Sequence, residues 1–358
     1  MKKIFIDGYF RRNLGDDLFF YILQNRYNEQ FYAYAAKKYA YDRDLLNIEF
    51  NKSNLVFYLN KIIGKLKKEY NYGALKKIKK MDYLITIGGS VFIEPENIEF
   101  EKLYKKYDIL ENTYVIGANF GPYKTEKYKE YINKKIKAMK DVCFRDEYSY
   151  KLFKQNNNVR FASDIVFSLD TKFLDNTAKK MVTISVIDLS NRDKLKKYQI
   201  LYERKIIELI IYFKAKGYNI TLMSFCKDEG DEKVIRRIKS ELDFKIDEYF
   251  YRDNIVEALN VINSSQIIVG TRFHANILGL VMNKTIIPIA YSDKTINALK
   301  DINYKGKIYD IRKIHEFDIN KINEDDLNYK IDVNKQKRDA HRHFEILDKV
   351  LDRKDNNE

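Results

Sequence analysis

The sequence is poor in the residues that hold together small extracellular folds or metal sites. Its 358 residues include only two cysteines, Cys143 and Cys226, and four histidines. Two cysteines cannot build a disulfide framework, and no group of Cys and His has metal-ligand spacing. We therefore predict no disulfide scaffold, no metal and no other cofactor. The cysteine content fits a reducing cytoplasm.

Long apolar runs are lacking as well. No stretch reaches the roughly 20 apolar residues that a membrane-spanning helix needs. The apolar run at the start of the chain ends at Asp7, which is too early for a secretory signal. We expect a cytoplasmic protein that is neither exported by this route nor integral to a membrane.

Charge, in contrast, is abundant and unbalanced. Lys and Arg number 66 against 52 Asp and Glu, which gives a net charge of +14. Such a charge suits nucleic acid, an anionic membrane surface or a phosphorylated substrate. The lysines are spread through helical segments together with Glu and Asp, apart from basic pieces such as Lys65-Leu66-Lys67-Lys68. This distribution favours solvated helix faces. We predict no nucleic-acid partner, and we keep peripheral contact with the inner face of the membrane as an alternative.

Short apolar runs alternate with helical periodicity along the whole chain. The predicted strands cover residues 3–7, 31–34, 83–87, 113–118, 142–146, 182–187, 220–225, 267–269 and 285–289. The apolar residues 55–59 fit either a strand or a helix. This alternation predicts an α/β fold with parallel sheets, arranged as two domains with a cleft between them.

The predicted domain boundaries follow a change in composition. An N-terminal domain is assigned to residues 1–170 and a C-terminal domain to 180–310, with a polar linker over 170–180. The polar segment 311–358 then closes with an amphipathic helix over 344–351.

The first strand is followed by a polar turn that contains glycine. Asn13 and Gly15 lie in this turn, and Asp16 or Asp17 could cap the helix that follows. The turn is not a G-x-G-x-x-G sequence, so dinucleotide binding is not predicted.

Glycines and polar residues also end the later strands. Gly88 and Gly89 follow strand 83–87, where adjacent glycines let a ligand approach the backbone, although a tight turn explains them equally well. Asn119 follows strand 113–118. Arg145 lies where a strand turns into a helix, the edge at which open α/β sheets bind ligands.

The most informative turn runs from Gly270 to His274. It joins strand 267–269 to a helix whose N-terminus favours an anion. Arg272 offers a planar fork of donors for a carboxylate or phosphate. His274 can hold or release a proton near neutral pH. A structural histidine and a plain turn and cap are the alternatives for this segment.

Six segments, in this order, resemble those of the polysaccharide pyruvyl transferases. They are Asn13-Leu14-Gly15-Asp16-Asp17, Gly88-Gly89-Ser90, Gly117 to Pro122, Arg145-Asp146-Glu147-Tyr148-Ser149, Asp164 to Phe167, and Gly270-Thr271-Arg272-Phe273-His274. The likeness runs from Gly8 to about Leu299. The sequence departs from the family pattern at Gly270, Ser90 and Gly279, where serine, glycine and alanine are usual.

The resemblance implies an α/β fold of two Rossmann-like domains facing a cleft, which is GT-B-like. It also implies the transfer of an enolpyruvyl unit from phosphoenolpyruvate to a sugar, closed as a cyclic ketal. It implies that phosphoenolpyruvate binds near Arg272 and His274, and that a glycan or lipid-linked glycan acceptor binds the N-terminal domain. The predicted catalytic residues are His274 and Asp16. The predicted substrate-binding residues are Arg272, Arg145, Thr271, Asn13, Gly15, Gly88, Gly89, Ser90 and Asn119.

These residue types agree with that chemistry. Phosphoenolpyruvate carries a carboxylate and a phosphate, so its pocket needs cations and oriented N–H groups. His274 suits general acid or base work, and Asp16 could orient or deprotonate an acceptor hydroxyl.

Two other functions remain as alternatives. A GT-B-type glycosyltransferase would use the same edge residues to bind the diphosphate of a nucleotide sugar. A non-catalytic binder of anionic polymer would suit the net charge, but basic patches interleaved with aromatic residues are missing.

Overall fold

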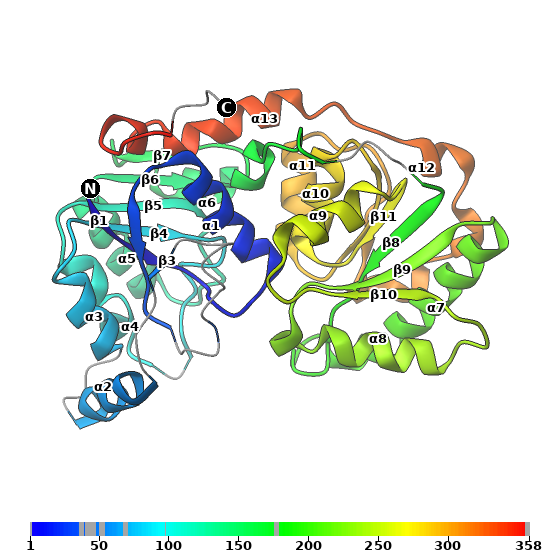
Figure 1. Cartoon of the computed structure of the whole chain (residues 1–358), viewed down its shortest axis with the longest axis horizontal. Coiled ribbons are helices and arrows are strands. Elements are labelled where there is room, and N and C mark those ends of the chain that lie inside the picture. The colour runs from blue at the N-terminus through cyan, green and yellow to red at the C-terminus, as the bar shows by residue number, and fades with distance from the viewer. Residues whose placement is uncertain are drawn as a thin grey trace. The chain divides into compact units, whose positions relative to one another are not determined.

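The chain folds into two α/β units, seen in the computed structural model of Figure 1. The structure describes residues 2–35, 39, 48–49, 54–66, 71–96, 98–174 and 179–354. The first unit consists of Met1–Phe10, Leu18–Ser168 and Arg338–Glu358. The second unit consists of Arg11–Asp17 and Leu169–Lys337.

The first unit is built on a seven-stranded parallel sheet with the order β3-β2-β1-β4-β5-β6-β7. Its strands are β1 (Lys3–Asp7), β2 (Gln30–Tyr32), β3 (Ile48–Glu49), β4 (Tyr83–Ile87), β5 (Thr113–Ala118), β6 (Asp141–Phe144) and β7 (Val159–Phe161). β5 and β6 are buried along their whole length, because helices cover both faces of a parallel sheet.

Helices connect these strands along the chain. They are α1 (Leu14–Arg26), α2 (Asn54–Leu66), α3 (Tyr72–Ile78), α4 (Phe100–Leu103), α5 (Glu126–Ala138) and α6 (Glu147–Phe153). Thr125 caps α5 by accepting a hydrogen bond from the Tyr128 N–H. Ile132 and Ile136, four residues apart on the same face of α5, are buried.

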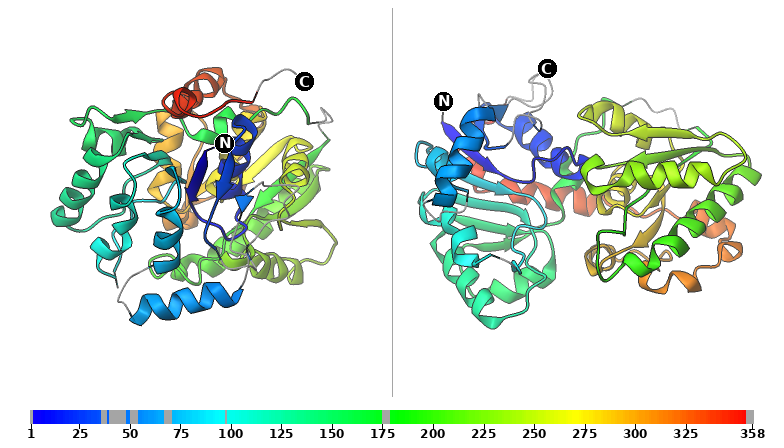
Figure 2. Two further views of the ribbon diagram at one scale, coloured as in Figure 1. Left: turned by 60° about the vertical axis from the view of Figure 1, so that its left-hand side comes forward. Right: turned by 90° about the horizontal axis from the view of Figure 1, so that it is seen from below.

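The second unit is built on a six-stranded parallel sheet with the order β10-β9-β8-β11-β12-β13. Its strands are β8 (Met181–Ser185), β9 (Asn219–Ser224), β10 (Asp247–Phe250), β11 (Ile267–Gly270), β12 (Thr285–Ala290) and β13 (Tyr309–Asp310). Its helices are α7 (Gln199–Ala215), α8 (Asp231–Ser240), α9 (Ile255–Asn263), α10 (Phe273–Val281), α11 (Asp293–Asp301) and α12 (Glu324–Asn328). Figure 2 shows the same units from two further directions.

Each sheet reverses its strand order at one point. In the first unit β1 pairs with β4, and in the second unit β8 pairs with β11. Such switch points, at the carboxyl ends of parallel strands, are where open α/β sheets bind ligands. The segment from Gly270 to His274 begins at the last residue of β11 and therefore lies at the switch point of the second unit.

The units can be compared with the ranges expected from sequence. The central segment of the first unit ends at Ser168, two residues before the predicted boundary. Residues 175–178 of the predicted linker lie outside the described residues. The predicted C-terminal segment 311–358 is divided, because α13 (Asn334–Ala340) runs from the second unit into the first. Phe344 and Leu347 are fully buried there.

Three local predictions are settled or corrected. Residues 55–59 lie in helix α2. The predicted helix over 344–351 is wrong, because this region forms short 3-10 turns at His341–Phe344 and Leu347–Lys349. Its apolar residues are still buried, since a tighter turn presents the same side chains to the core.

The predicted cap of α1 is also wrong. The helix already begins at Leu14, so Asp16 and Asp17 lie in its first turn. The residue that takes the capping role is Asn13, whose Oδ1 accepts a hydrogen bond of 3.0 Å from the Gly15 N–H.

No helix among the described residues is long and apolar enough to cross a membrane.

Candidate functional site

The turn after β11 is held by buried hydrogen bonds from β8 and α7. The Ser185 hydroxyl accepts hydrogen bonds from the backbone N–H groups of Thr271 and Arg272, at 3.0 and 3.2 Å. The Thr271 hydroxyl lies 3.0 Å from the buried hydroxyl of Tyr202. These contacts fix where α10 begins, with Arg272 as the residue before its first turn.

Arg272 is paired with two carboxylates. Its Nε donates to Asp231 at 3.1 Å and a terminal nitrogen donates to the other Asp231 oxygen, so the pair is bidentate. A second terminal nitrogen donates to Glu229 at 2.6 Å. The Arg272 side chain is 6% exposed. Burial disfavours its charge, but the two carboxylates outweigh burial and raise the pKa of Arg272 above its ordinary value.

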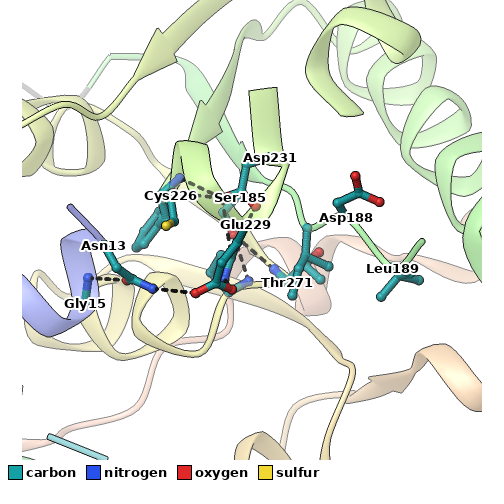
Figure 3. Close-up of polar contacts among 12 residues, drawn as sticks. Asn13, Gly15, Ser185, Asp188, Leu189, Cys226, Glu229, Asp231 and Thr271 are labelled. Atoms are coloured by element: carbon teal, nitrogen blue, oxygen red, sulfur yellow. Dashed lines mark hydrogen bonds and ion pairs between the residues drawn. The ribbon is translucent and has the colours of Figure 1, made fainter. Parts of the chain in front are cut away.

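Glu229 joins three parts of the second unit (Figure 3). One carboxylate oxygen accepts hydrogen bonds from Arg272 and from Arg192, the latter at 3.0 Å. The other accepts from the Asn13 side-chain amide at 3.1 Å. Burial favours the neutral acid, but the neighbouring Arg272 and the other donors lower the pKa of Glu229 below its ordinary value. The carboxylate is therefore ionised at neutral pH.

The two carboxylates come from the chain after β9: Glu229 lies in the turn before α8, and Asp231 is the first residue of α8. Gly230 stands between them with φ of +90°, a left-handed conformation that favours glycine. An added Cβ there would lie 2.6 Å from an Asp188 carboxylate oxygen. Asp231 also accepts the backbone N–H groups of Phe225 and Cys226, at 2.9 and 3.0 Å.

The polar turn near the N-terminus belongs to this second unit. Asn13 bridges to Cys226, and the Leu14 N–H donates to the Phe225 carbonyl at 3.0 Å. Gly15 lies directly against His274, because an added Cβ would approach the His274 Nδ1 to 1.9 Å. Two segments more than 250 residues apart in sequence, the turn at 13–17 and the turn at 270–274, therefore meet at one sheet edge.

Within that turn the two aspartates differ in their surroundings. Asp17 is fully buried and accepts a hydrogen bond of 2.7 Å from the Tyr251 hydroxyl. Asp16 is partly exposed. Only Asp16 of the pair is therefore open to a solute from solvent.

A second polar cluster lies at the carboxyl ends of β4, β5 and β6 in the first unit. Arg145 donates to Asp164 at 2.8 Å and to the Asn119 side chain at 3.1 Å. The Asn119 N–H donates to the Gly89 carbonyl at 2.7 Å. A Cβ at Gly89 would lie 2.3 Å from an Arg145 nitrogen, so glycine is what lets Arg145 lie across this backbone.

Part of this cluster has a structural role. Asp146 caps α6 by accepting the Ser149 N–H at 2.8 Å. The Ser149 hydroxyl donates to Asp146 and accepts the Phe120 N–H at 2.7 Å. The Arg-Asp-x-x-Ser segment thus closes a helix end and fixes the chain after β5.

The structure brings the predicted site residues together as two groups. Asn13, Gly15, Asp16, Thr271, Arg272 and His274 lie in the second unit, and Gly88, Gly89, Ser90, Asn119 and Arg145 lie in the first. Gly88 is buried with φ of +141°, and Ser90 is exposed. Both predicted anion-binding arginines, Arg272 and Arg145, are paired with buried carboxylates, which the sequence did not indicate.

Three site residues were missed. Glu229, Asp231 and Arg192 received no role from sequence, although an acidic loop directly after a buried strand was visible at 227–232. That position, at the carboxyl end of a parallel strand, was the available signal. Among the described residues, no group of three or more His, Cys, Asp or Glu side chains is arranged to hold a metal ion.

Comparison with known proteins identifies a family whose model covers the residues of both clusters. A family model described as polysaccharide pyruvyl transferase matches residues 13–293. The chain is also similar to the amylovoran biosynthesis protein AmsJ of Erwinia amylovora, with 22% identity over 271 residues. That match covers 69% of this chain and 65% of AmsJ, slightly under two thirds of the relative's length.

Solved structures share the fold. A UDP-GlcNAc 2-epimerase from Neisseria meningitidis, bound to UDP-GlcNAc, has a TM-score of 0.59 at 12% identity, over 98% of this chain and 99% of the epimerase. An S. aureus MnaA structure with UDP has a TM-score of 0.58 at 12% identity, over 98% and 96%. These likenesses confirm the predicted GT-B-like α/β fold.

Proposed function

The chain belongs to the polysaccharide pyruvyl transferase family, and we propose that it moves a pyruvyl group from phosphoenolpyruvate to a sugar of a cell-surface polysaccharide or its precursor. The product is a pyruvate ketal. The observation that carries this proposal is the family match over residues 13–293, which spans both turns that meet at Gly15 and His274.

The reaction needs one proton donor and two acceptor hydroxyls. Protonation of the methylene carbon of phosphoenolpyruvate makes the neighbouring carbon electrophilic, and the first sugar hydroxyl adds to it. Phosphate then leaves, and the second hydroxyl adds to the same carbon and closes the ring. Each hydroxyl releases its proton to a base or to solvent. We assign the protonation to His274 and the activation of an acceptor hydroxyl to Asp16.

The contacts of Arg272 support a positioning role in this reaction. Its donors already serve Asp231 and Glu229. In our proposal Arg272 positions Glu229, and Glu229 positions Asn13 by accepting its side-chain amide. Asn13 in turn accepts the Gly15 N–H and so places Gly15 against the ring of His274.

Arg192 is the better placed arginine for the anionic donor. Its side chain is 33% exposed, it donates one terminal nitrogen to Glu229, and its guanidinium lies 4.9 Å from the centre of the Tyr291 ring. A planar fork held in this way suits a carboxylate or phosphate. The start of α10 would complete the donor side. Thr271 is buried and bonded to Ser185 and Tyr202, so we propose that it positions this helix start.

The first-unit residues Gly88, Gly89, Ser90 and Asn119 are the proposed acceptor side. Arg145, which the sequence suggested for the anionic donor, is bonded to Asn119 and Asp164, and we propose it on the acceptor side as well.

The test is incubation of the protein with phosphoenolpyruvate and candidate glycans or lipid-linked glycans. We expect phosphate release and a gain in glycan mass that corresponds to one pyruvate ketal. His274→Gln should abolish both while phosphoenolpyruvate still binds, as read by calorimetry. Substantial turnover in His274→Gln would remove the imidazole from the proton transfer. If none of the acceptors tested gained pyruvate, the result would argue against this class of reaction.

A nucleotide-sugar glycosyltransferase is the second candidate. It is favoured by the fold shared with an S. aureus MnaA structure that holds UDP and an epimerase structure that holds UDP-GlcNAc. The same incubation with nucleotide sugars separates the two functions, since release of nucleoside diphosphate together with a gain of a sugar residue supports only this candidate.

A further inference from the structure

Helix α2 of the first unit packs through its less apolar side. Phe57 stacks on Tyr34 with ring centres 5.4 Å apart, and Gly64 is buried. Phe57, Asn60 and Gly64 recur at spacings of three and four residues, so they share one face of the helix. This face is turned toward the rest of the unit, where α2 also contacts α3.

The opposite face of α2 is apolar and exposed. Tyr58, Leu59, Ile62, Ile63 and Leu66 are 36–79% exposed, although large apolar side chains normally lie in a core. Their spacing of three and four residues places them on one stripe along the helix. Figure 1 shows α2 at the outer edge of its unit, beside α3. A contiguous apolar stripe of this kind marks a protein or membrane contact.

Positive charge is concentrated in the same region. Residues 51–80 contain nine lysines and one glutamate, a net +8 out of the +14 of the chain. Lys61 and Lys65 are exposed on α2, and Lys76 is exposed on α3. This stretch includes the sequence Lys65-Leu66-Lys67-Lys68, the basic piece that stands out from the otherwise mixed distribution of lysines.

We propose that α2 and α3 dock this protein on the surface of an anionic phospholipid bilayer. The apolar stripe enters the boundary between headgroups and acyl chains, and the lysines contact the anionic headgroups. This combination of an apolar face with flanking lysines is how interfacial amphipathic helices bind.

Charge selects lipid over a second copy of the chain. Residues 54–66 and 71–80, which the structure describes, contain six lysines and no Asp or Glu. Two copies that joined through α2 would bring two such regions against each other, which like-charge repulsion opposes. An anionic bilayer offers both an apolar phase and the opposite charge. The inference goes beyond the proposed transferase reaction and does not depend on it.

The test is flotation of the full-length protein with vesicles. One set is neutral phosphatidylcholine, and in the other a third of the lipid is phosphatidylglycerol. We expect binding to the anionic set only, weakened by high salt. Lys61→Gln with Lys65→Gln should lower the partition coefficient roughly twentyfold, because each lysine near such a surface is worth roughly fivefold. Leu59→Asn with Ile62→Asn should lower it roughly tenfold or more.

Matched controls come from other exposed helices. Ile200→Asn with Ile211→Asn on α7 removes two exposed apolar side chains, of 69% and 52% exposure, outside the proposed surface. Lys134→Gln with Lys137→Gln on α5 removes two exposed lysines. Both controls should bind as wild type does. Circular dichroism and thermal unfolding should show that all four variants fold.

Three results would overturn the proposal. The first is α2 variants that float like wild type or like their controls. The second is a dimer in sedimentation equilibrium that only the Leu59→Asn, Ile62→Asn variant dissociates. The third is tight binding of a short RNA by the wild type without binding to anionic vesicles.

Discussion

At the scale of single residues, the site of the second unit is a balanced set of charges. Asp231 and Glu229 carry two negative charges, and Arg272 and Arg192 carry two positive ones within hydrogen-bond distance. Arg272 and Asp231 are both buried, so each needs the other, because an unpaired buried charge is costly. Arg192 and Glu229 are the more exposed members and can exchange partners with a solute.

The two arginines should therefore respond differently to the same substitution. Arg272→Lys removes the planar fork that spans Asp231 and Glu229, and an ammonium cannot reproduce it. We expect roughly 2–4 kcal/mol lower stability together with loss of most activity. Chemical denaturation and phosphate release measure these.

Arg192→Lys is the matched control. It should leave the free energy of unfolding within about 0.5 kcal/mol of wild type and mainly raise the KM for phosphoenolpyruvate. If Arg272→Lys instead raised only that KM at unchanged stability, Arg272 would contact the donor directly.

The contact between Gly15 and His274 can be tested by a double-mutant cycle. Gly15→Ala places a methyl group where the His274 ring lies, so we expect the ring to move and phosphoenolpyruvate turnover to fall by at least roughly tenfold. Calorimetry should show that the donor still binds.

The second arm of the cycle measures stability, since His274→Ala is expected to be inactive. Gly15→Ala should cost less free energy of unfolding in the His274→Ala background than in wild type, because the clash is gone. Equal costs in both backgrounds would place the effect of Gly15 elsewhere.

At the scale of elements, the C-terminal turns are tied to the sheet of the first unit by a buried histidine. The Gly117 N–H donates to His343 Nδ1 at 3.3 Å, and His343 Nε2 lies 2.9 Å from the Ser163 carbonyl. A neutral ring with its proton on Nε2 satisfies both contacts. Burial lowers the pKa of His343 to about 4, against the opposing influence of Asp164.

This histidine should make stability depend on pH. Between about pH 6.5 and pH 4 the unfolded chain binds a proton at this position and the folded chain does not, so stability is lost as the pH falls through that window. From pH 7 to pH 5 we expect the contribution of His343 to fall by about 2 kcal/mol. Urea unfolding at several pH values measures the slope.

A variant without the titrating group should have a flatter slope. His343→Gln is expected to lose most of this decline, whereas His315→Gln, at an exposed position, should keep it. An unchanged slope in His343→Gln would mean that the ring titrates normally in the folded state.

At the scale of the whole molecule, each unit is assembled from distant parts of the chain. The first unit contains both ends, Met1–Phe10 and Arg338–Glu358, and the second unit takes up Arg11–Asp17. Phe344 shows what the C-terminal segment contributes. Its side chain is fully buried, its ring lies 6.3 Å from that of Tyr27, and Arg26 lies 4.7 Å from its centre.

Removal of this ring should destabilise the first unit. Phe344→Ala is expected to lower the free energy of unfolding by roughly 3–5 kcal/mol, because it leaves a cavity between the C-terminal turns and the sheet. Phe173→Ala, at a side chain 49% exposed, should cost under about 1 kcal/mol. Denaturant melts of both variants provide the comparison, and similar losses would show that 338–358 adds little to the core.

The sequence alone determined the type of the main elements and the edge at which function is expected. Strands such as 83–87 and 113–118 were predictable because a parallel strand covered on both faces is apolar at most positions. The turns at Asn13 and Gly270 were predictable because polar residues and glycine occur where such strands give way to helices. Local pattern could not separate a helix from 3-10 turns at 344–351, since both bury the same side chains.

Only the tertiary structure decided which of these residues meet. Asn13 and Gly15 lie with Arg272 and His274, rather than with the strand that precedes them, because the backbone around Leu14 pairs with the end of β9. The partners of Arg272 were equally hidden. A guanidinium selects whichever carboxylates the fold brings within reach, and Glu229 and Asp231 reach it from a loop more than 40 residues away.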